Sequence, residues 1–329
     1  MNIKIIGCGL SGITAAVLLK ERGHTVEIFD TRNHIGGNCY DSNLNGVLVH
    51  NYGPHIFHTN DEEVWSFLNK YTTFNYFKYC PKALLNDNKT ISLPYSLTTI
   101  EELNKELTSD EIIELIYKDY SEKQWGLPFD QISKAIMTRV PVLKNEKSPS
   151  WYGSEKYQGI PSKGYTYMMN NMLDGFTVHL GVNLDEYKKL SGDLIIYTGR
   201  IDEFYNFIYG SLPYRTLKFE HEITPNRLFH HAINQCNKIN SYTRIYDHSY
   251  FLDQHEPLTV ITKEYPLEFT GHGVPYYPIP FGKGHEIYNQ YKKLADKETN
   301  VIFLGRLATY KYLDMWMTIK QAMLKCKDI

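Results

Sequence analysis

The stretch that decides the fold is Met1–Gly12, which reads MNIKIIGCGLSG. A short apolar strand here runs directly into the pattern Gly-x-Gly-x-x-Gly. An Ala- and Leu-rich segment at 14–22 has the composition of a helix, and residues 25–30 read as a second strand that ends in Asp30. The order strand, glycine turn, helix and strand predicts a complete βαβ unit at the start of the chain.

The glycines of this turn have distinct physical roles. Gly7 permits the tight turn, Gly9 lets a pyrophosphate approach the backbone, and Gly12 lets helix and strand pack closely, while Ser11 lies where the helix N-terminus offers free N–H groups. Asp30 stands where an acidic side chain accepts a hydrogen bond from an adenosine ribose. Glycines after a strand can also mark a simple turn. Because helix, strand and acidic residue all fall at the expected spacing, we predict a dinucleotide site.

A second glycine-rich loop follows the second strand. Residues Thr31–Asn38 contain Gly36 and Gly37 side by side, which indicates a loop that lies close against a ligand. Asn38 follows them directly. This arrangement resembles FAD-binding proteins more than NAD dehydrogenases.

Composition limits the other functions. The 329 residues, 42% of them hydrophobic, suffice for a core and for about two domains. A net charge of −2 argues against a general nucleic-acid binder, so placed cations must hold an anionic small ligand. Three glycines interrupt the apolar run of Met1–Leu19 and no cleavage signature follows it, which argues against a secretion signal. No stretch approaches the ~18 apolar residues that span a bilayer. The cysteines are odd in number and form no C-x-x-C pair, so we expect a reduced, cytoplasmic setting without a membrane.

The remaining pattern predicts a mixed α/β chain. Expected strands are 46–51, a hairpin of 76–85 with 89–93, 176–180, 193–197, 301–306, and one antiparallel sheet from 217–222, 242–247, 258–265 and 274–278. Expected helices are 62–70, 129–137, 166–173, 286–294 and 312–327, with two short helices at 99–107 and 109–120. The two short helices begin at the capping boxes Thr99–Glu102 and Thr108–Glu111.

Three further places point to a ligand. The strand at 193–197 ends in Thr198-Gly199 and the strand at 301–306 ends in Gly305-Arg306, and ligands sit at the carboxyl ends of strands in open α/β sheets. Residues about 143–157 form a long, weakly patterned segment, which we predict to be a mobile lid. His55 and His58 suggest a metal pair, but no third ligand of suitable spacing stands nearby. They are otherwise loop histidines or groups that line a ligand.

Ordered motifs along nearly the whole chain resemble the bacterial UDP-galactopyranose mutase family. They are 32–38, 52–60, 120–126, 158–166, 263–268, 275–278 and 305–314. The resemblance implies a Rossmann-like FAD-binding domain built from 1–75, 162–216 and 296–329, a small helical domain at 97–138, and an antiparallel β-sheet domain from 76–96, 139–161 and 217–295.

The resemblance also implies a function and its residues. The family interconverts UDP-galactopyranose and UDP-galactofuranose through a covalent adduct between reduced flavin N5 and the sugar, with no net redox change. FAD must therefore be reduced by an external reductant. By matching position, Arg139 and Arg244 grip the diphosphate, His55 and His58 lie by the flavin, and Arg306 contacts FAD. Tyr120 and Trp125 match the uridine side, and the tyrosines and carboxylate near the diphosphate and sugar are Tyr152, Tyr277, Tyr312 and Asp314.

Two features of this chain differ from the family pattern and limit how far the family's properties can be expected here. Tyr79-Cys80-Pro81 replaces an Asn-Ser-Pro on the sugar side, and the chain between Leu93 and Tyr120 is markedly shorter than in bacterial members. Because the helical domain helps to build the usual homodimer, we expect a monomer or an atypical homodimer. An FAD oxidoreductase of the amine oxidase or desaturase kind, a non-catalytic UDP-sugar binder and a mutase of an N-acetylhexosamine remain alternatives.

Overall fold

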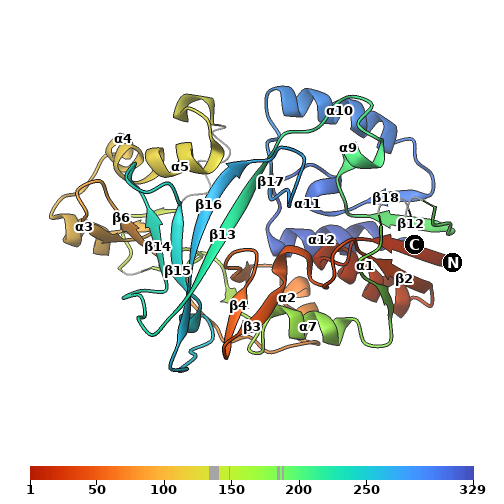
Figure 1. The fold of residues 1–329 in the computed structure, drawn as a ribbon, viewed down its shortest axis with the longest axis horizontal. Coiled ribbons are helices and arrows are strands. Elements are labelled where there is room, and N and C mark those ends of the chain that lie inside the picture. Colours follow the sequence, from red (N-terminus) through yellow and green to blue (C-terminus); the bar gives the residue numbers. More distant parts are fainter. Residues whose placement is uncertain (133–140, 148, 184–185, 187–188) are drawn as a thin grey trace.

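The computed structural model describes residues 1–132, 141–147, 149–183, 186 and 189–329. A parallel sheet with its helices lies at one end of the molecule, and the long strands of a larger sheet run through its middle (Figure 1). A small group of helices lies at the opposite end, beyond the larger sheet. The α/β fold class predicted from the sequence is confirmed.

The described part of the chain forms a five-stranded parallel sheet with the order β11-β2-β1-β12-β18. Its strands are β1 (Asn2–Ile6), β2 (Thr25–Phe29), β11 (Thr177–His179), β12 (Leu194–Tyr197) and β18 (Val301–Phe303). Helices α1 (Leu10–Glu21) and α12 (Met315–Lys325) pack against each other beside this sheet. The C-terminal strand and helix therefore return to the N-terminal unit, as predicted. β18 is a half-buried edge strand that ends at Phe303, and a short helix begins at Gly305, so the expectation of a strand through 306 is wrong.

The larger sheet, within the described residues, has seven strands in the order β17-β13-β16-β15-β14-β6-β7. They are β6 (Lys82–Leu84), β7 (Thr90–Ser92), β13 (Tyr214–Thr224), β14 (Ala232–Gln235), β15 (Arg244–Asp247), β16 (Thr259–Glu268) and β17 (Tyr277–Pro278). The predicted antiparallel arrangement of β13, β15, β16 and β17 is confirmed. β14 was not predicted, and it pairs in parallel with β6. The predicted hairpin is correct but shorter, because 76–81 is not a strand.

The helical group differs from the prediction at its ends. It comprises α3 (Leu97–Leu103), α4 (Ser109–Ile112), the π-helical turn η2 (Ile113–Tyr117), α5 (Lys118–Trp125) and the 3₁₀ turn η3 (Phe129–Gln131). The capping box of Thr108 with Glu111 is confirmed. The one proposed for Thr99 is wrong, because Ser96 caps α3 and Thr99 is its third residue. Residues 133–137 of the helix expected at 129–137 lie outside the described residues.

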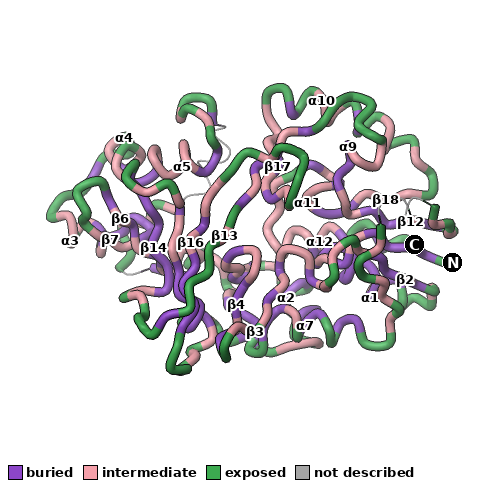
Figure 2. The backbone as a smooth tube through the Cα atoms, in the orientation of Figure 1, coloured by how far each residue is buried: buried purple, intermediate pink, exposed green. Residues whose placement is uncertain are grey.

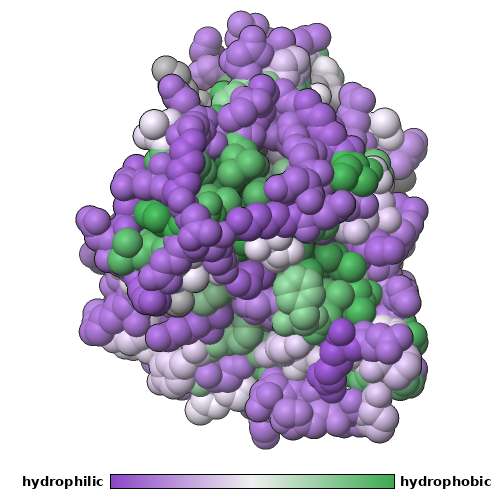
Figure 3. Space-filling model, turned by 90° about the vertical axis from the view of Figure 1, so that its left-hand side faces the viewer, coloured by the Kyte–Doolittle hydropathy of each residue, from purple (hydrophilic) through white to green (hydrophobic). Residues whose placement is uncertain are grey.

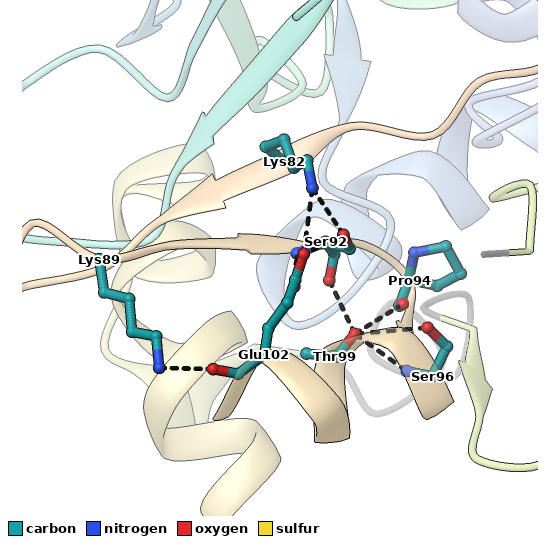
Figure 4. A network of polar contacts seen from close by, with 7 residues as sticks. All are labelled: Lys82, Lys89, Ser92, Pro94, Ser96, Thr99 and Glu102. Atoms are coloured by element: carbon teal, nitrogen blue, oxygen red, sulfur yellow. Dashed lines mark hydrogen bonds and ion pairs between the residues drawn. The ribbon is translucent and has the colours of Figure 1, made fainter. Parts of the chain in front are cut away.

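A polar network explains why Thr99 and Glu102 do not form a capping box with each other (Figure 4). Thr99 Oγ1 accepts from Ser96 N at 3.1 Å and donates to the Ser92 carbonyl at 2.8 Å. Glu102 instead accepts from Ser92 Oγ at 2.7 Å and pairs with Lys82 Nζ at 3.2 Å. These contacts fasten α3 to the hairpin of β6 and β7.

The remaining elements lie outside the two main sheets and the helical group. They are η1 (Gly37–Cys39), β3 (Asp41–Leu44), β4 (Val47–His50), β5 (Phe57–Thr59), α2 (Glu62–Leu68), β8 (Tyr95–Ser96), β9 (Val142–Leu143), β10 (Tyr157–Gly159), α7 (Tyr165–Met172), α9 (Ile201–Phe204), η4 (His248–Tyr250), α10 (Lys283–Ala295) and α11 (Gly305–Ala308). β9 pairs with β8, and β10 pairs with β5. The two ends of the 143–157 segment are thus held by strands, and its mobility stays a prediction.

Burial is concentrated in the strands of both sheets and in α1 (Figure 2). The helical group has its own apolar cluster with β6 and β7, which includes Ala83, Ile91, Tyr95 and Ile116. Seen from that end, hydrophobic side chains gather in patches between hydrophilic rows (Figure 3). The domain boundaries and the oligomeric state stay predictions. Among the described residues, no helix is long and apolar enough to cross a membrane, and all five cysteines are free.

Candidate functional site

Two adjoining cavities contain nearly all the residues that the sequence singled out. The first cavity, of about 730 Å³, lies at the carboxyl ends of the parallel strands. The second cavity, of about 910 Å³, lies between α5, the larger sheet, the 151–155 segment and the start of α12.

The first cavity is bordered by the residues that follow β1, β2, β12 and β18. Its lining includes ten of the predicted cofactor residues: Gly7, Gly9, Ser11, Asp30, Thr31, Gly37, Asn38, Thr198, Gly199 and Arg306. A crevice at the carboxyl ends of parallel strands is the usual ligand site of a doubly wound sheet.

The glycine turn is fitted closely to its surroundings. Gly7 has a φ of +109°, and a Cβ on it would lie 1.9 Å from Thr198 Oγ1. Gly12 does not line the cavity. A Cβ on Gly12 would lie 2.0 Å from the Gly7 carbonyl oxygen, so its role is the close packing of helix on turn. Gly37 reaches the same turn, because its Cβ would lie 3.0 Å from Gly9 Cα.

Charged side chains shape the two loops around this cavity. Asp30 accepts from the backbone N–H groups of Cys8 at 2.6 Å and Arg32 at 2.8 Å, so its carboxylate ties the loops together. Arg32 donates through Nη2 to Asn38 Oδ1 at 2.9 Å. Its Nη1 is buried and, within the described residues, lacks a partner. Arg32 lines the first cavity and was not among the predicted cofactor residues. An anionic ligand would pair with this group.

The two predicted histidines go to different cavities. His55 lines the first cavity, where its Nδ1 donates to the Gly53 carbonyl at 2.7 Å. Burial, with a smaller contribution from His50, lowers the pKa of His55 to about 3. His55 is therefore a neutral ring. His58 lines the second cavity instead. Among the described residues, no group of three or more His, Cys, Asp or Glu side chains is arranged to hold a metal.

The second cavity collects the predicted substrate residues. Its lining includes His58, Tyr120, Trp125, Tyr152, Arg244, Tyr277, Tyr312 and Asp314. These residues come from β5, α5, β15, β17, the 143–157 segment and the turn before α12. They are far apart in the sequence, and the fold brings them together. Arg139 lies outside the described residues.

Arg244 is held by a buried carboxylate. Glu264 is fully buried, and its Oε1 accepts from Arg244 Nη2 at 2.7 Å and Nε at 3.1 Å. The two residues face each other across β15 and β16. Burial opposes the charge of Arg244, but the Glu264 carboxylate raises the pKa of Arg244 well above its ordinary value. A fixed cation therefore faces the second cavity.

Aromatic rings join the two cavities. Tyr277 and Tyr312 stack at 5.6 Å and 13°. The guanidinium of Arg306 lies 5.6 Å from the centre of the Tyr277 ring and 5.1 Å from that of Tyr312. Trp125 lies 6.2 Å from Tyr277. Because Arg306 lines the first cavity and the tyrosines line the second, a ligand in one cavity would lie next to a ligand in the other.

Sequence reasoning missed polar groups in the second cavity. Gln124 Oε1 and Asn234 Oδ1 are buried and have no hydrogen-bond partner within the part of the chain that the structure describes. Both residues line the cavity, as does Tyr79. In the sequence, only the position of Gln124 directly before Trp125 pointed to it. Asn234 lies on the unpredicted strand β14.

The comparisons with known proteins agree with this arrangement. The family model described as UDP-galactopyranose mutase matches residues 115–312, and the NAD(P)-binding Rossmann-like domain matches residues 5–71. A crystal structure titled as reduced UDP-galactopyranose mutase superposes with a TM-score of 0.79 over 99% of this chain and 94% of the other. At 12% identity this likeness shows the fold alone.

Full-length relatives are similar at the level of sequence. A dTDP-fucopyranose mutase of Escherichia coli is 34% identical over 100% of this chain and 98% of its own. A probable UDP-galactopyranose mutase of Klebsiella pneumoniae is 35% identical over 98% and 93%. A UDP-galactopyranose mutase of Mycoplasma genitalium is 30% identical over 100% and 94%. This chain therefore belongs to the UDP-galactopyranose mutase family.

Proposed function

We propose that this protein is a flavin-dependent mutase that interconverts the pyranose and furanose forms of a nucleotide-linked hexose, with UDP-galactose as the first candidate. The observation that carries the proposal is the contact between the two cavities. The cation of Arg306 and the rings of Tyr277 and Tyr312 join a dinucleotide cavity to one that presents a fixed arginine, tyrosines and a carboxylate.

FAD fits the first cavity. Gly7 and Gly9 of the glycine turn line this cavity, where the backbone of such a turn can hold a pyrophosphate, and the unpartnered Nη1 of Arg32 offers a cationic donor to it. Bound and reduced, FAD would supply N5 as a nucleophile for the anomeric carbon of the sugar, with no net oxidation or reduction. The residues of this chain then bind, orient and neutralise the substrate.

Arg244 is suited to the diphosphate of that substrate. When the bond from the anomeric carbon to the diphosphate breaks, negative charge builds up on the departing oxygen, and a preorganised guanidinium stabilises it. Glu264 fixes the direction of the Arg244 side chain through two hydrogen bonds to one carboxylate oxygen. By the family resemblance we assign the same task to Arg139.

The pyrimidine base has a place at the α5 side of the second cavity. Tyr120 and Trp125 offer aromatic faces there, and the unpartnered oxygens of Gln124 and Asn234 can accept from N–H and hydroxyl groups. A pocket of this kind suits both uracil and thymine.

A second candidate substrate is dTDP-fucopyranose. The relative named for that substrate is as similar to this chain as the galactopyranose relatives are, at 34% against 35% and 30% identity, and it matches the whole chain. The two substrates differ in the nucleoside and at C6 of the sugar. The cavity lining also leaves an N-acetylhexosamine as an alternative.

The test is a comparison of nucleotide sugars on one enzyme preparation. The purified protein is incubated without oxygen with UDP-galactofuranose or dTDP-fucofuranose, each with and without dithionite, and the products are separated by chromatography. We expect conversion to the pyranose form only with dithionite, and the preferred substrate identifies the nucleotide and sugar. A protein that binds UDP but converts neither compound would be a non-catalytic binder.

A further inference from the structure

His58 is held on three sides at the edge of the second cavity. Its backbone pairs with Gln158 in the two-stranded sheet of β5 and β10. Its Nδ1 lies 2.8 Å from Oε2 of Glu155, and its ring stacks on Tyr152 with 3.7 Å between centres and 8° between planes. Such a ring has little freedom to turn.

The carboxylate fixes the position of the imidazole proton. An ionised carboxylate can only accept hydrogen bonds, so the neutral ring carries its proton on Nδ1 and donates it to Glu155. The lone pair then lies on Nε2. Within the described residues no hydrogen bond to Nε2 exists, and the ring, with 11% of its side chain exposed, lines the cavity beside Tyr152 and Glu155.

The proposed reaction needs a proton carrier in this cavity. Conversion of a hexopyranose to a furanose breaks the bond from C1 to O5 and forms one from C1 to O4. O5 keeps the electron pair of its bond and gains a proton, while O4 gives an electron pair to C1 and loses a proton. One proton leaves and one enters, so a single base that takes a proton and returns it balances the exchange.

We propose that Glu155 is a positioning residue, which holds His58 with Nε2 free to move the proton between the C4 hydroxyl and the ring oxygen. This inference rests on the proposed function. Glu155 acts only through His58, because it stabilises the imidazolium that forms when Nε2 takes the proton, as a carboxylate does behind a histidine base.

The same contacts link His58 to the 143–157 segment. Tyr152 and Glu155 both belong to it, and the segment is held separately by Lys156 and Tyr157, which both contact Glu62. Glu62 has no contact with His58 among those that the structure describes. The substitution Glu62→Gln therefore removes an exposed ion pair of the segment and leaves the contact between Glu155 and His58 in place, so it is the matched control for Glu155→Gln.

The experiment measures turnover and tautomer in the full-length reduced holoenzyme. For E155Q we expect kcat to fall by about tenfold to a hundredfold, because a glutamine amide holds either tautomer and stabilises imidazolium poorly. KM and the affinity for UDP should stay within about twofold. In protein labelled with ¹⁵N-histidine, NMR should show the Nδ1–H form of His58 in the wild type and a mixture in E155Q. E62Q should match the wild type in kcat and tautomer. In the background of His58→Gln, adding E155Q should lower kcat no further.

The failures can be told apart. A wild type that converts no nucleotide sugar refutes the proposed function and this inference with it. With an active wild type, an unchanged kcat in E155Q, an equal fall in E62Q or an Nε2–H form of His58 in the wild type refutes the inference alone. If E155Q folds poorly, the NMR spectrum of the wild type and the kcat of H58Q still test the inference. A wild-type kcat in H58Q would show that His58 does not carry the proton.

Discussion

The substitution Arg244→Ala should lower both the stability of the protein and its turnover, through two different contacts. Arg244 is the one described partner of the carboxylate of Glu264, which has no exposed surface. The other carboxylate oxygen of Glu264, Oε2, already lacks a hydrogen-bond partner within the described residues. Without the guanidinium, a carboxylate remains unpaired in the interior.

The structure sets the size of each effect. Removing one partner of a buried ion pair destabilises a protein by about 3–5 kcal/mol, whereas replacing both partners by apolar groups is often neutral. Glu264 is fully buried, but 21% of the Arg244 side chain is exposed in the second cavity, so the lower end of this range applies. Arg244→Ala should therefore lower the free energy of unfolding by about 3 kcal/mol, and Arg244→Met with Glu264→Leu should recover most of it. Loss of a preorganised donor to the developing charge lowers kcat by about 10²–10³. The double variant should not regain that activity.

The assay follows urea unfolding by circular dichroism, flavin content by absorbance, and turnover of the reduced enzyme, for the wild type and both variants. Flavin content should stay at the wild-type level, because Arg244 lines the second cavity and not the first. A stable Arg244→Ala would show that the pair with Glu264 is not buried in solution. Recovery of kcat in the double variant would show that Arg244 is a structural cation only, and loss of FAD would move it to the cofactor.

Three further outcomes are expected. Gly7→Ala should give a folded but colourless protein, because φ of Gly7 is +109° and the added Cβ would lie 1.9 Å from Thr198 Oγ1. A yellow variant with normal flavin content would contradict the role assigned to this turn. Asp41→Ala should lower the free energy of unfolding by about 1.5–3 kcal/mol in urea titrations, because Asp41 accepts hydrogen bonds from Tyr165 N and Thr166 N at the start of α7. An unchanged midpoint of urea unfolding would mean that water replaces the Asp41 carboxylate as the partner of these N–H groups. Limited trypsin treatment should cut the 143–157 segment first and UDP should protect it, since the segment borders the second cavity; equal cleavage with and without UDP would exclude a lid.

Local patterns were sufficient for the dinucleotide unit. The turn from Gly7 to Gly12, the acidic residue Asp30 and the loop at Gly37 all use neighbouring residues in the chain, and the structure places them as expected. The capping box at Thr108 is of the same kind. Thr99 misled the prediction because its hydroxyl and the carboxylate of Glu102 are used by the hairpin instead, which only the tertiary structure reveals.

The missed residues depend on pairings between distant segments. Glu264 meets Arg244 through the register of β15 and β16, and Glu155 meets His58 across 97 residues of chain. Strand β14 is buried along its whole length between two neighbours, so it lacks the alternation that marks a strand with one exposed face. Asn234, which lies on it, could not be placed for that reason.

The most direct test of the central claim is the ratio of product formed to flavin oxidised. The reduced enzyme is freed of excess dithionite without oxygen and given the preferred nucleotide furanose, while absorbance follows the flavin and chromatography follows the pyranose product. We predict many molecules of product for each flavin, with the spectrum of the flavin still reduced at the end. One flavin oxidised for each molecule of product, with no more than one product molecule per flavin before turnover stops, would contradict the account and identify an oxidoreductase.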